Sequence, residues 1–160
     1  MSDDLDLQSS RYPRQMRYAP LPQSYYLAFH EGLQNAIYWD GALMSHMAKI
    51  DSLEKPAVIA DFMLRFDKAR WALVTGVYDN KLLLSLRTET STLLPAADMM
   101  KRLIRGLGDG GGHRTKAGGF IRLQTGSDAE VEKIRKTVRR RYLRSLGIKQ
   151  ARGTRLVPPG

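Results

Sequence analysis

The spacing of apolar residues changes several times along the chain, and each spacing predicts a different element. Short apolar or aromatic runs at 25–29 and 36–39 have the length of strands. The stretch 41–50 fits a short helix or a strand, and its pattern leaves both open. A helix opens at Pro56, because proline is tolerated in a first turn. One face of that helix carries Ile59, Phe62, Met63 and Phe66 at helical spacing.

Two strand-like runs, 71–78 and 82–86, lie on either side of Asp79-Asn80. Asp and Asn tolerate the positive φ of a tight turn, so this arrangement predicts a β-hairpin. In the second strand the period of two places Ser85 and Arg87 on one face, opposite the neighbouring leucines.

The segment after the hairpin predicts a helix, a glycine-rich loop and a strand. The helix is capped by Ser91 or Thr92 and ends at Gly106 and Gly108. Its apolar stripe consists of Leu93, Ala97, Met100, Ile104 and Leu107. The glycine-rich loop covers 109–119, and the strand covers 120–123.

The last predicted helix runs from about 128 to 146. Ser127 or Asp128 caps it, and Gly147 ends it. Its buried seam consists of Val131, Ile134, Val138 and Tyr142.

This order of elements indicates an α/β protein of the α+β type, in which helices flank a mostly antiparallel or mixed sheet. The glycine-rich loop is expected at one open end of that sheet. The proline-rich segment 1–22 is predicted to be an extended lead-in or linker, 23–147 the folded domain, and 148–160 a frayed tail.

Composition excludes several classes of protein. The 160 residues are 42% hydrophobic, which is enough for a core. The chain has no cysteine, so a disulfide framework, a cysteine zinc site and a cysteine nucleophile are excluded. No apolar run approaches the roughly 18–20 residues of a membrane span, and the acidic segment 1–10 is not a secretory signal. We therefore expect a cytoplasmic protein without a membrane partner.

The formal net charge of +10 and the pI of about 10.1 favour polyanionic partners such as nucleic acid. A generally basic protein without a nucleic-acid role fits the charge equally well. Ten Lys and Arg residues between Lys133 and Arg155 form either a solvated face or a nucleic-acid contact. His30, His46 and His113 lack a spacing that pairs them on a metal, so we expect no metal site in this chain alone.

The segment 108–119 is the strongest candidate for chemistry, because six of its twelve residues are glycine. Successive glycine N–H groups can point together at an anion. His113, Arg114 and Lys116 place side-chain donors beside them. A flexible surface loop is the alternative. Arg87 at the end of a strand can bind a phosphate through two parallel hydrogen bonds, or it can be an edge-strand arginine in water.

Gly110-Gly-Gly-His113, followed by Ala117-Gly118-Gly119-Phe120, resembles the signature of the DHH-associated domain of DHH phosphoesterases. The segments 60–65, 71–76 and 85–88 follow in the order and spacing of that family, and the resemblance covers about residues 35–125. Many members continue the signature with His-Pro and two alanines. This chain has His113-Arg114 and Ala117-Gly118 instead, which leaves the subfamily and the substrate open.

The resemblance implies the substrate-binding domain of a phosphoesterase such as an oligoribonuclease (nanoRNase), a cyclic-dinucleotide phosphodiesterase or a RecJ-type exonuclease. These enzymes hydrolyse phosphodiester or phosphomonoester bonds of short oligonucleotides or nucleotides. Their separate catalytic domain holds two metal ions, usually manganese, with ligands that include an Asp-His-His triplet absent from this sequence. We therefore expect no hydrolysis by this chain alone, and a DHH catalytic domain as its partner.

The resemblance implies that a phosphate of nucleic acid or nucleotide is bound by the glycine–histidine loop, Gly110, Gly111, Gly112 and His113, and by the strand arginine Arg87. Arg114 and Lys116, where the chain departs from the family pattern, are expected to add phosphate contacts. Two alternatives remain open. One is a non-catalytic basic RNA- or tRNA-binding module, like the related domain at the C-terminus of alanyl-tRNA synthetases. The other is an oligomerising domain with an incidental glycine loop.

Overall fold

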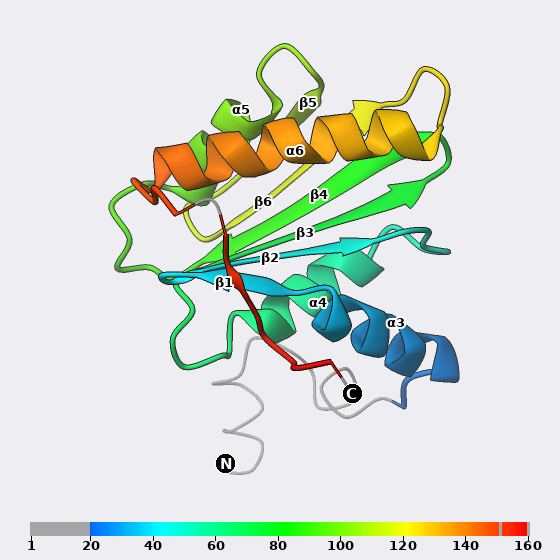
Figure 1. The fold of residues 1–160 in the computed structure, drawn as a ribbon, viewed down its shortest axis with the longest axis horizontal. Coiled ribbons are helices and arrows are strands. Elements are labelled where there is room, and N and C mark those ends of the chain that lie inside the picture. Colours follow the sequence, from blue (N-terminus) through cyan, green and yellow to red (C-terminus); the bar gives the residue numbers. More distant parts are fainter. Residues whose placement is uncertain (1–19, 151, 160) are drawn as a thin grey trace, which may run out of the picture.

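The computed structural model of this chain describes residues 20–150 and 152–159. Seven strands form one sheet in the order β5-β6-β4-β3-β2-β1-β7 (Figure 1). Only β2 and β3 run parallel, and the other neighbours are antiparallel, so the predicted mixed sheet is confirmed. The strands are β1 (Ile37–Trp39), β2 (Ala42–Met47), β3 (Trp71–Tyr78), β4 (Lys81–Thr88), β5 (Asp109–Gly112), β6 (Lys116–Arg122) and β7 (Thr154–Arg155).

Helices cover both faces of the sheet, as Figure 1 shows. On one face α3 (Gln23–Gln34) and α4 (Lys55–Met63) pack against apolar residues of β2 and β3. On the other face α5 (Ala96–Ile104) and α6 (Asp128–Ser145) pack against the leucines of β4 and against β6. Tyr142 is fully buried in α6, and its hydroxyl donates to Leu43 O at 2.9 Å. None of the helices in the described part of the chain is long and apolar enough to cross a membrane.

The predicted hairpin is confirmed and occupies the centre of the sheet. β3 and β4 pair from Trp71↔Thr88 to Tyr78↔Lys81. Asp79 and Asn80 adopt φ values of 49° and 61°, the left-handed region that these residue types tolerate.

One early segment differs from its prediction, and a second resolves a choice that the sequence left open. Residues 25–29 belong to α3, not to a strand. Ala28 and Gly32, four residues apart, are buried there, and a Cβ at Gly32 would lie 3.0 Å from Ile59 Cγ2. A small residue at this crossing lets α3 approach α4, and tertiary packing overrides the local strand propensity. Within the stretch 41–50, Ala42–Met47 form β2, so the open choice between helix and strand is settled as a strand.

Helix α5 begins later than predicted, because neither Ser91 nor Thr92 caps it. Both side chains bond to Glu89 instead, and the helix starts after Pro95. Leu93 is 96% exposed and is therefore not part of the apolar stripe. The residues that the helix buries are Ala96, Met99, Met100, Leu103 and Ile104.

The two predicted termini have different outcomes. Residues 1–19 of the predicted lead-in 1–22 lie outside the described part. The predicted frayed tail, 148–160, contains β7, which pairs with β1 through Ile37↔Arg155 and Tyr38↔Thr154. Arg155 Nη2 also donates to Gln34 O at 2.9 Å. The tail is ordered there because it supplies partners for the backbone groups of β1 that would otherwise form a sheet edge.

Ser127 caps α6 as predicted, accepting a hydrogen bond from Glu130 N at 3.1 Å. The Glu130 carboxylate accepts in turn from the backbone amides of Gln124, Thr125 and Gly126, at 2.7, 2.9 and 2.9 Å. These amide hydrogen bonds, that of Gln124 first, lower the pKa of Glu130 to about 2. The loop between β6 and α6 is thus held by one ionised carboxylate.

We expect Glu130→Gln to lower the unfolding temperature at pH 7, since the amide loses the charge that these donors favour. A carboxylate whose pKa is depressed in the folded state stabilises above its unfolded pKa of about 4.5. That stabilisation disappears as the pH falls toward about 2. Thermal unfolding of both proteins between pH 7 and 2 should therefore show a difference that shrinks below pH 4.5. Asp67→Asn, at an exposed aspartate outside this loop, is the control and should change little.

Candidate functional site

The glycine-rich segment forms most of a β-hairpin at one edge of the sheet. Gly110–Gly112 lie in β5, which pairs with β6 only, and His113 N donates to Lys116 O at 2.7 Å across the turn. The prediction of a loop is therefore wrong for these glycines, because they form an extended strand at the edge of the sheet. Its predicted place at one open end of the sheet is confirmed.

The glycines divide into two groups by what a side chain would meet. A Cβ at Gly110 or Gly112 would overlap the backbone of β6, and one at Gly119 would lie 2.9 Å from Met100 Sδ of α5. These three positions need glycine for close packing. A Cβ at Gly111 would meet nothing within 4 Å, and one at Gly118 would meet only Leu84 O at 3.7 Å. A Cβ at Gly108 would also strike Phe120 O, so packing explains four of the six glycines, and bare exposed backbone remains at Gly111 and Gly118.

The turn of this hairpin caps helix α5. Ala96 N donates to Arg114 O at 2.7 Å, and Ala97 N donates to His113 O at 2.9 Å. The first amides of the helix are therefore taken by the protein's own carbonyls. Arg114 also donates from Nη2 to Thr92 O at 3.1 Å and from Nε to Thr90 O at 3.4 Å. Its guanidinium therefore holds the segment before α5 through these two hydrogen bonds. That Arg114 contacts a phosphate stays a prediction.

Alternation along β4 and β6 gives this part of the sheet a second surface on the side of α3 and α4, which we call the open face; α4 covers part of β4 there, and Ser85 is buried. Leu82, Leu84 and Leu86 point to the α5–α6 core together with Ala117 and Ile121 of β6. The intervening residues point the other way. The open face consists of Lys81, Leu83, Ser85 and Arg87 of β4, Lys116, Gly118, Phe120 and Arg122 of β6, and Asp109 and Gly111 of β5.

Arg87 and Lys116 are directly opposed in the pairing of β4 with β6. Residues in such positions have Cβ atoms about 4.5–5.5 Å apart. The register therefore places these two cations next to each other on neighbouring strands, and their convergence on one phosphate stays a prediction. Lys116 is exposed, and no described side chain pairs with it. His113 is exposed at the turn, and whether its ring reaches the same point stays a prediction.

Arg87 is not an edge-strand arginine in water. β4 lies between β6 and β3, and the Arg87 side chain is only 11% exposed. Its Nε lies 2.6 Å from Asp61 Oδ1 of α4, and its Nη1 donates to Leu86 O at 3.0 Å. Within the described residues its Nη2 has no partner. The guanidinium is fixed by the protein and keeps one nitrogen for a ligand.

Sequence reasoning missed three further residues of the open face. Lys81 Nζ lies 5.8 Å, and Arg122 Cζ 5.6 Å, from the centre of the Phe120 ring. Lys81 pairs with Arg122 across the strands, although 41 positions separate them in the chain. The only sequence signal was the alternation Phe120-Ile121-Arg122, which needs the strand register before it points to Lys81.

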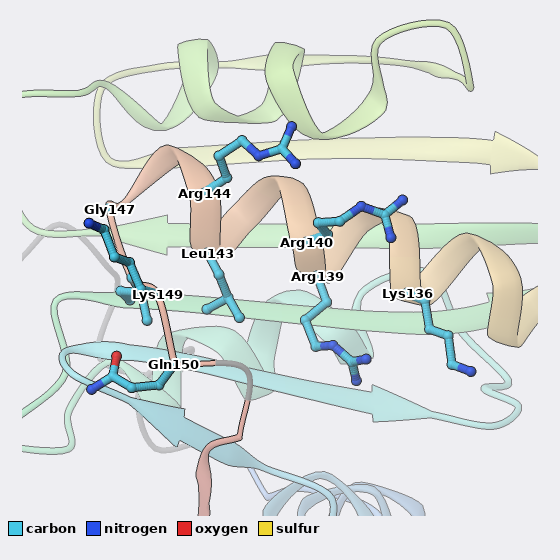
Figure 2. A pocket seen from close by; sticks show the side chains of 9 residues that line it. Lys136, Arg139, Arg140, Leu143, Arg144, Gly147, Lys149 and Gln150 are labelled. Atoms are coloured by element: carbon cyan, nitrogen blue, oxygen red, sulfur yellow. The ribbon is translucent and has the colours of Figure 1, made fainter.

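A second cationic surface lies on α6, on the other face of the sheet. A groove of about 600 Å³ lies between this helix and residues 147–150. Figure 2 shows the side chains that line it. Leu143 and Ile148 supply apolar area, and no acidic residue lines it. Arg141, in contrast, donates to Leu103 O and Arg105 O and joins α6 to α5. The cations that line the groove are Lys136, Arg139, Arg140, Arg144 and Lys149.

Among the described residues, no three or more His, Cys, Asp or Glu side chains gather as metal ligands would. On the open face, Arg87, Lys116 and the bare backbone at Gly111 and Gly118 are groups of a kind that binds anions.

Gly110→Ala and Gly111→Ala should separate the two roles of the glycine strand. The first adds a methyl group that collides with β6 and should destabilise the protein by about 1–3 kcal/mol. The second adds a methyl in open space and should leave stability unchanged or slightly higher, since alanine loses less backbone entropy. Denaturant unfolding measures both. Equal destabilisation by the two changes would contradict the assignment of Gly111 to the open face.

A scan of the sequence against models of protein families finds no match, and no curated protein matches it. Among solved structures, the fold is similar to an exopolyphosphatase-related protein from Bacteroides fragilis, with a TM-score of 0.62 at 14% identity. It is also similar to RecJ in complex with Mn²⁺ from Thermus thermophilus, with a TM-score of 0.53 at 16% identity. The C-Ala domain from Aquifex aeolicus alanyl-tRNA synthetase gives a TM-score of 0.47 at 16% identity and covers 64% of this chain and 96% of that one.

The likeness covers unequal shares of the proteins compared. It includes 90% of this chain and 43% of the exopolyphosphatase-related protein, and 83% of this chain and 18% of RecJ. This chain therefore spans less than half of either protein. At these identities the likeness is one of fold. The chain thus has the fold of a part of RecJ and of the exopolyphosphatase-related protein, which is consistent with the DHH-associated domain that its sequence resembles.

Proposed function

We propose that this chain is the substrate-binding domain of a DHH-type phosphoesterase, and that its open face binds a phosphate of a nucleic acid or nucleotide. The observation that carries the proposal is the opposed pair Arg87 and Lys116 beside exposed glycine backbone. Guanidinium and ammonium donors form the stronger class of hydrogen bonds with phosphate oxygens.

Each residue of the open face has a different role in binding a phosphate. Arg87 is pre-positioned by Asp61 and offers Nη2, so little side-chain entropy is lost when a ligand binds. Lys116 adds an adaptable positive charge, and His113 adds a donor from the turn. Gly111 and Gly118 let a ligand approach the backbone, because neither carries a side chain.

Hydrolysis of phosphodiester or phosphomonoester bonds in short oligonucleotides or nucleotides would require a partner catalytic domain. Two metal ions, manganese in the family that the sequence resembles, would there activate water and stabilise charge on the phosphoryl oxygens. In this scheme the present chain binds and orients the substrate. The partner domain supplies the metal ligands that the described residues lack.

A second candidate function is a non-catalytic RNA- or tRNA-binding module. The groove on α6 favours it, since five cations line that groove without an acidic residue. The two functions differ in the ligand length that they need. A phosphate site on the open face binds a mononucleotide, whereas a basic helix gains affinity only as more phosphates are neutralised.

Arg87→Ala and His113→Ala should each weaken binding of a nucleoside monophosphate roughly ten- to a hundredfold. A hydrogen bond to a charged group contributes about 1.5–3 kcal/mol. Asp61→Ala should weaken binding about two- to tenfold, because the Arg87 guanidinium loses the ion pair that orients it and about 0.5–1.5 kcal/mol of side-chain entropy is then lost on binding. Isothermal titration calorimetry measures these affinities. Asp67→Asn, an exposed aspartate outside the open face, is the control, and unchanged binding by Arg87→Ala would contradict the site.

Changes on α6 should affect long strands and spare mononucleotides. Replacing Arg139, Arg140 and Arg144 together by Gln should make the log–log salt slope for a long single strand shallower by about 2, at roughly 0.7 per phosphate contact. The control is the same loss of charge on α5, with Lys101, Arg102 and Arg105 replaced by Gln. Fluorescence anisotropy at several salt concentrations measures the slope. An equal change in the control would attribute the effect to net charge and not to the groove.

A further inference from the structure

The strand register arranges the open face in rows that cross the strands. Arg87 and Lys116 form one row, and Ser85, Gly118 and Gly111 form the next. A third row consists of Leu83, Phe120 and Asp109, and Lys81 and Arg122 form the fourth. The second row has no side chain larger than serine. Ser85 is buried, whereas Gly118 and Gly111 are exposed and carry no side chain. We call this strip of exposed backbone, which lies between the cations of the first row and the Phe120 ring of the third, the trough.

Phe120 is placed as a ligand contact and not as a core residue. Its ring belongs to neither of the two hydrophobic cores, and its side chain is half-buried on the open face. The flanking cations lie at 5.8 and 5.6 Å, near the outer limit of about 6 Å for a cation–π contact. They are on long and mobile side chains, so a flat ligand can displace them or stack on the Arg122 guanidinium.

The first and third rows are spaced for an organic phosphate. Four residues along a strand separate Arg87 from Leu83 and Lys116 from Phe120, a backbone distance of about 13–14 Å. The side chains of the two rows extend toward each other, so the distance between their ends is on the order of the length of one nucleotide. A phosphate at Arg87 and Lys116 then leaves the sugar over Gly118 and the base beside Phe120.

We infer that Phe120, with Lys81 and Arg122, is a base-stacking platform, so that the trough takes a nucleotide or the end of a single strand and discriminates against inorganic polyphosphate. This inference rests on the proposed phosphate site and adds the identity of its ligand. Aromatic stacking is tolerant of sequence, because every base has a π-face. A polyphosphate chain has none and gains nothing from Phe120.

The test compares adenosine monophosphate with inorganic tripolyphosphate by titration calorimetry on the full chain. Phe120→Leu keeps an apolar side chain and removes the π-face. It should weaken adenosine monophosphate binding about tenfold and leave tripolyphosphate within about twofold. Phe120→Trp should retain or strengthen nucleotide binding. Arg87→Ala should weaken both ligands, and thermal unfolding checks that each variant is folded.

The results separate this inference from the function on which it rests. If Phe120→Leu and the wild type bind adenosine monophosphate equally, while Arg87→Ala still weakens it, the platform is wrong and the phosphate site stands. If Phe120→Leu weakens both ligands alike, Phe120 is structural and the discrimination is overturned. If the wild type binds neither ligand, or Arg87→Ala changes neither, the proposed function itself fails.

Discussion

The close approach of the β5 backbone to β6 is the constraint on which the rest of this surface depends. Gly110, Gly112 and Gly119 permit it, because a Cβ at any of them would strike the neighbouring strand or Met100 of α5. Because β5 lies this close to β6, α5 packs directly on the hairpin. The carbonyls of His113 and Arg114 in the turn then accept hydrogen bonds from the first amides of that helix. The glycines thus fix where α5 begins, and they leave the opposite side of the hairpin bare.

That bare side acquires its chemistry from the register between β4 and β6. The same pairing that opposes Arg87 to Lys116 also opposes Ser85 to Gly118 and Leu83 to Phe120. A slip by one residue would send the cations into the core and the leucines to solvent, so the buried leucines of β4 hold the register. Core packing on one face therefore determines the order of cation, glycine and aromatic rows on the other.

Sequence patterns predicted the elements whose signals are local. The hairpin around Asp79-Asn80 and the Ser127 cap of α6 each depend on residues a few positions apart. The start of α5 was missed because its cap comes from the carbonyls of His113 and Arg114, beyond the far end of the helix in sequence. The β7 pairing and the contact of Lys81 with Phe120 are long-range too. The phosphate-site residues could be named from the glycine–histidine motif, but their neighbours required the sheet order.

The ion pair between Arg87 and Asp61 explains how a partly covered arginine can serve a ligand. A guanidinium on the open face without a carboxylate would keep its rotamer freedom and lose it on binding. Asp61 is half exposed and bonds only Nε, so it fixes the side chain while water screens its charge. In the proposed site, a phosphate would meet Nη2 of a group that is already oriented, and Lys116 would supply the charge that Asp61 offsets. A lysine at position 87 would not meet this requirement, because its ammonium lacks a second, geometrically fixed nitrogen.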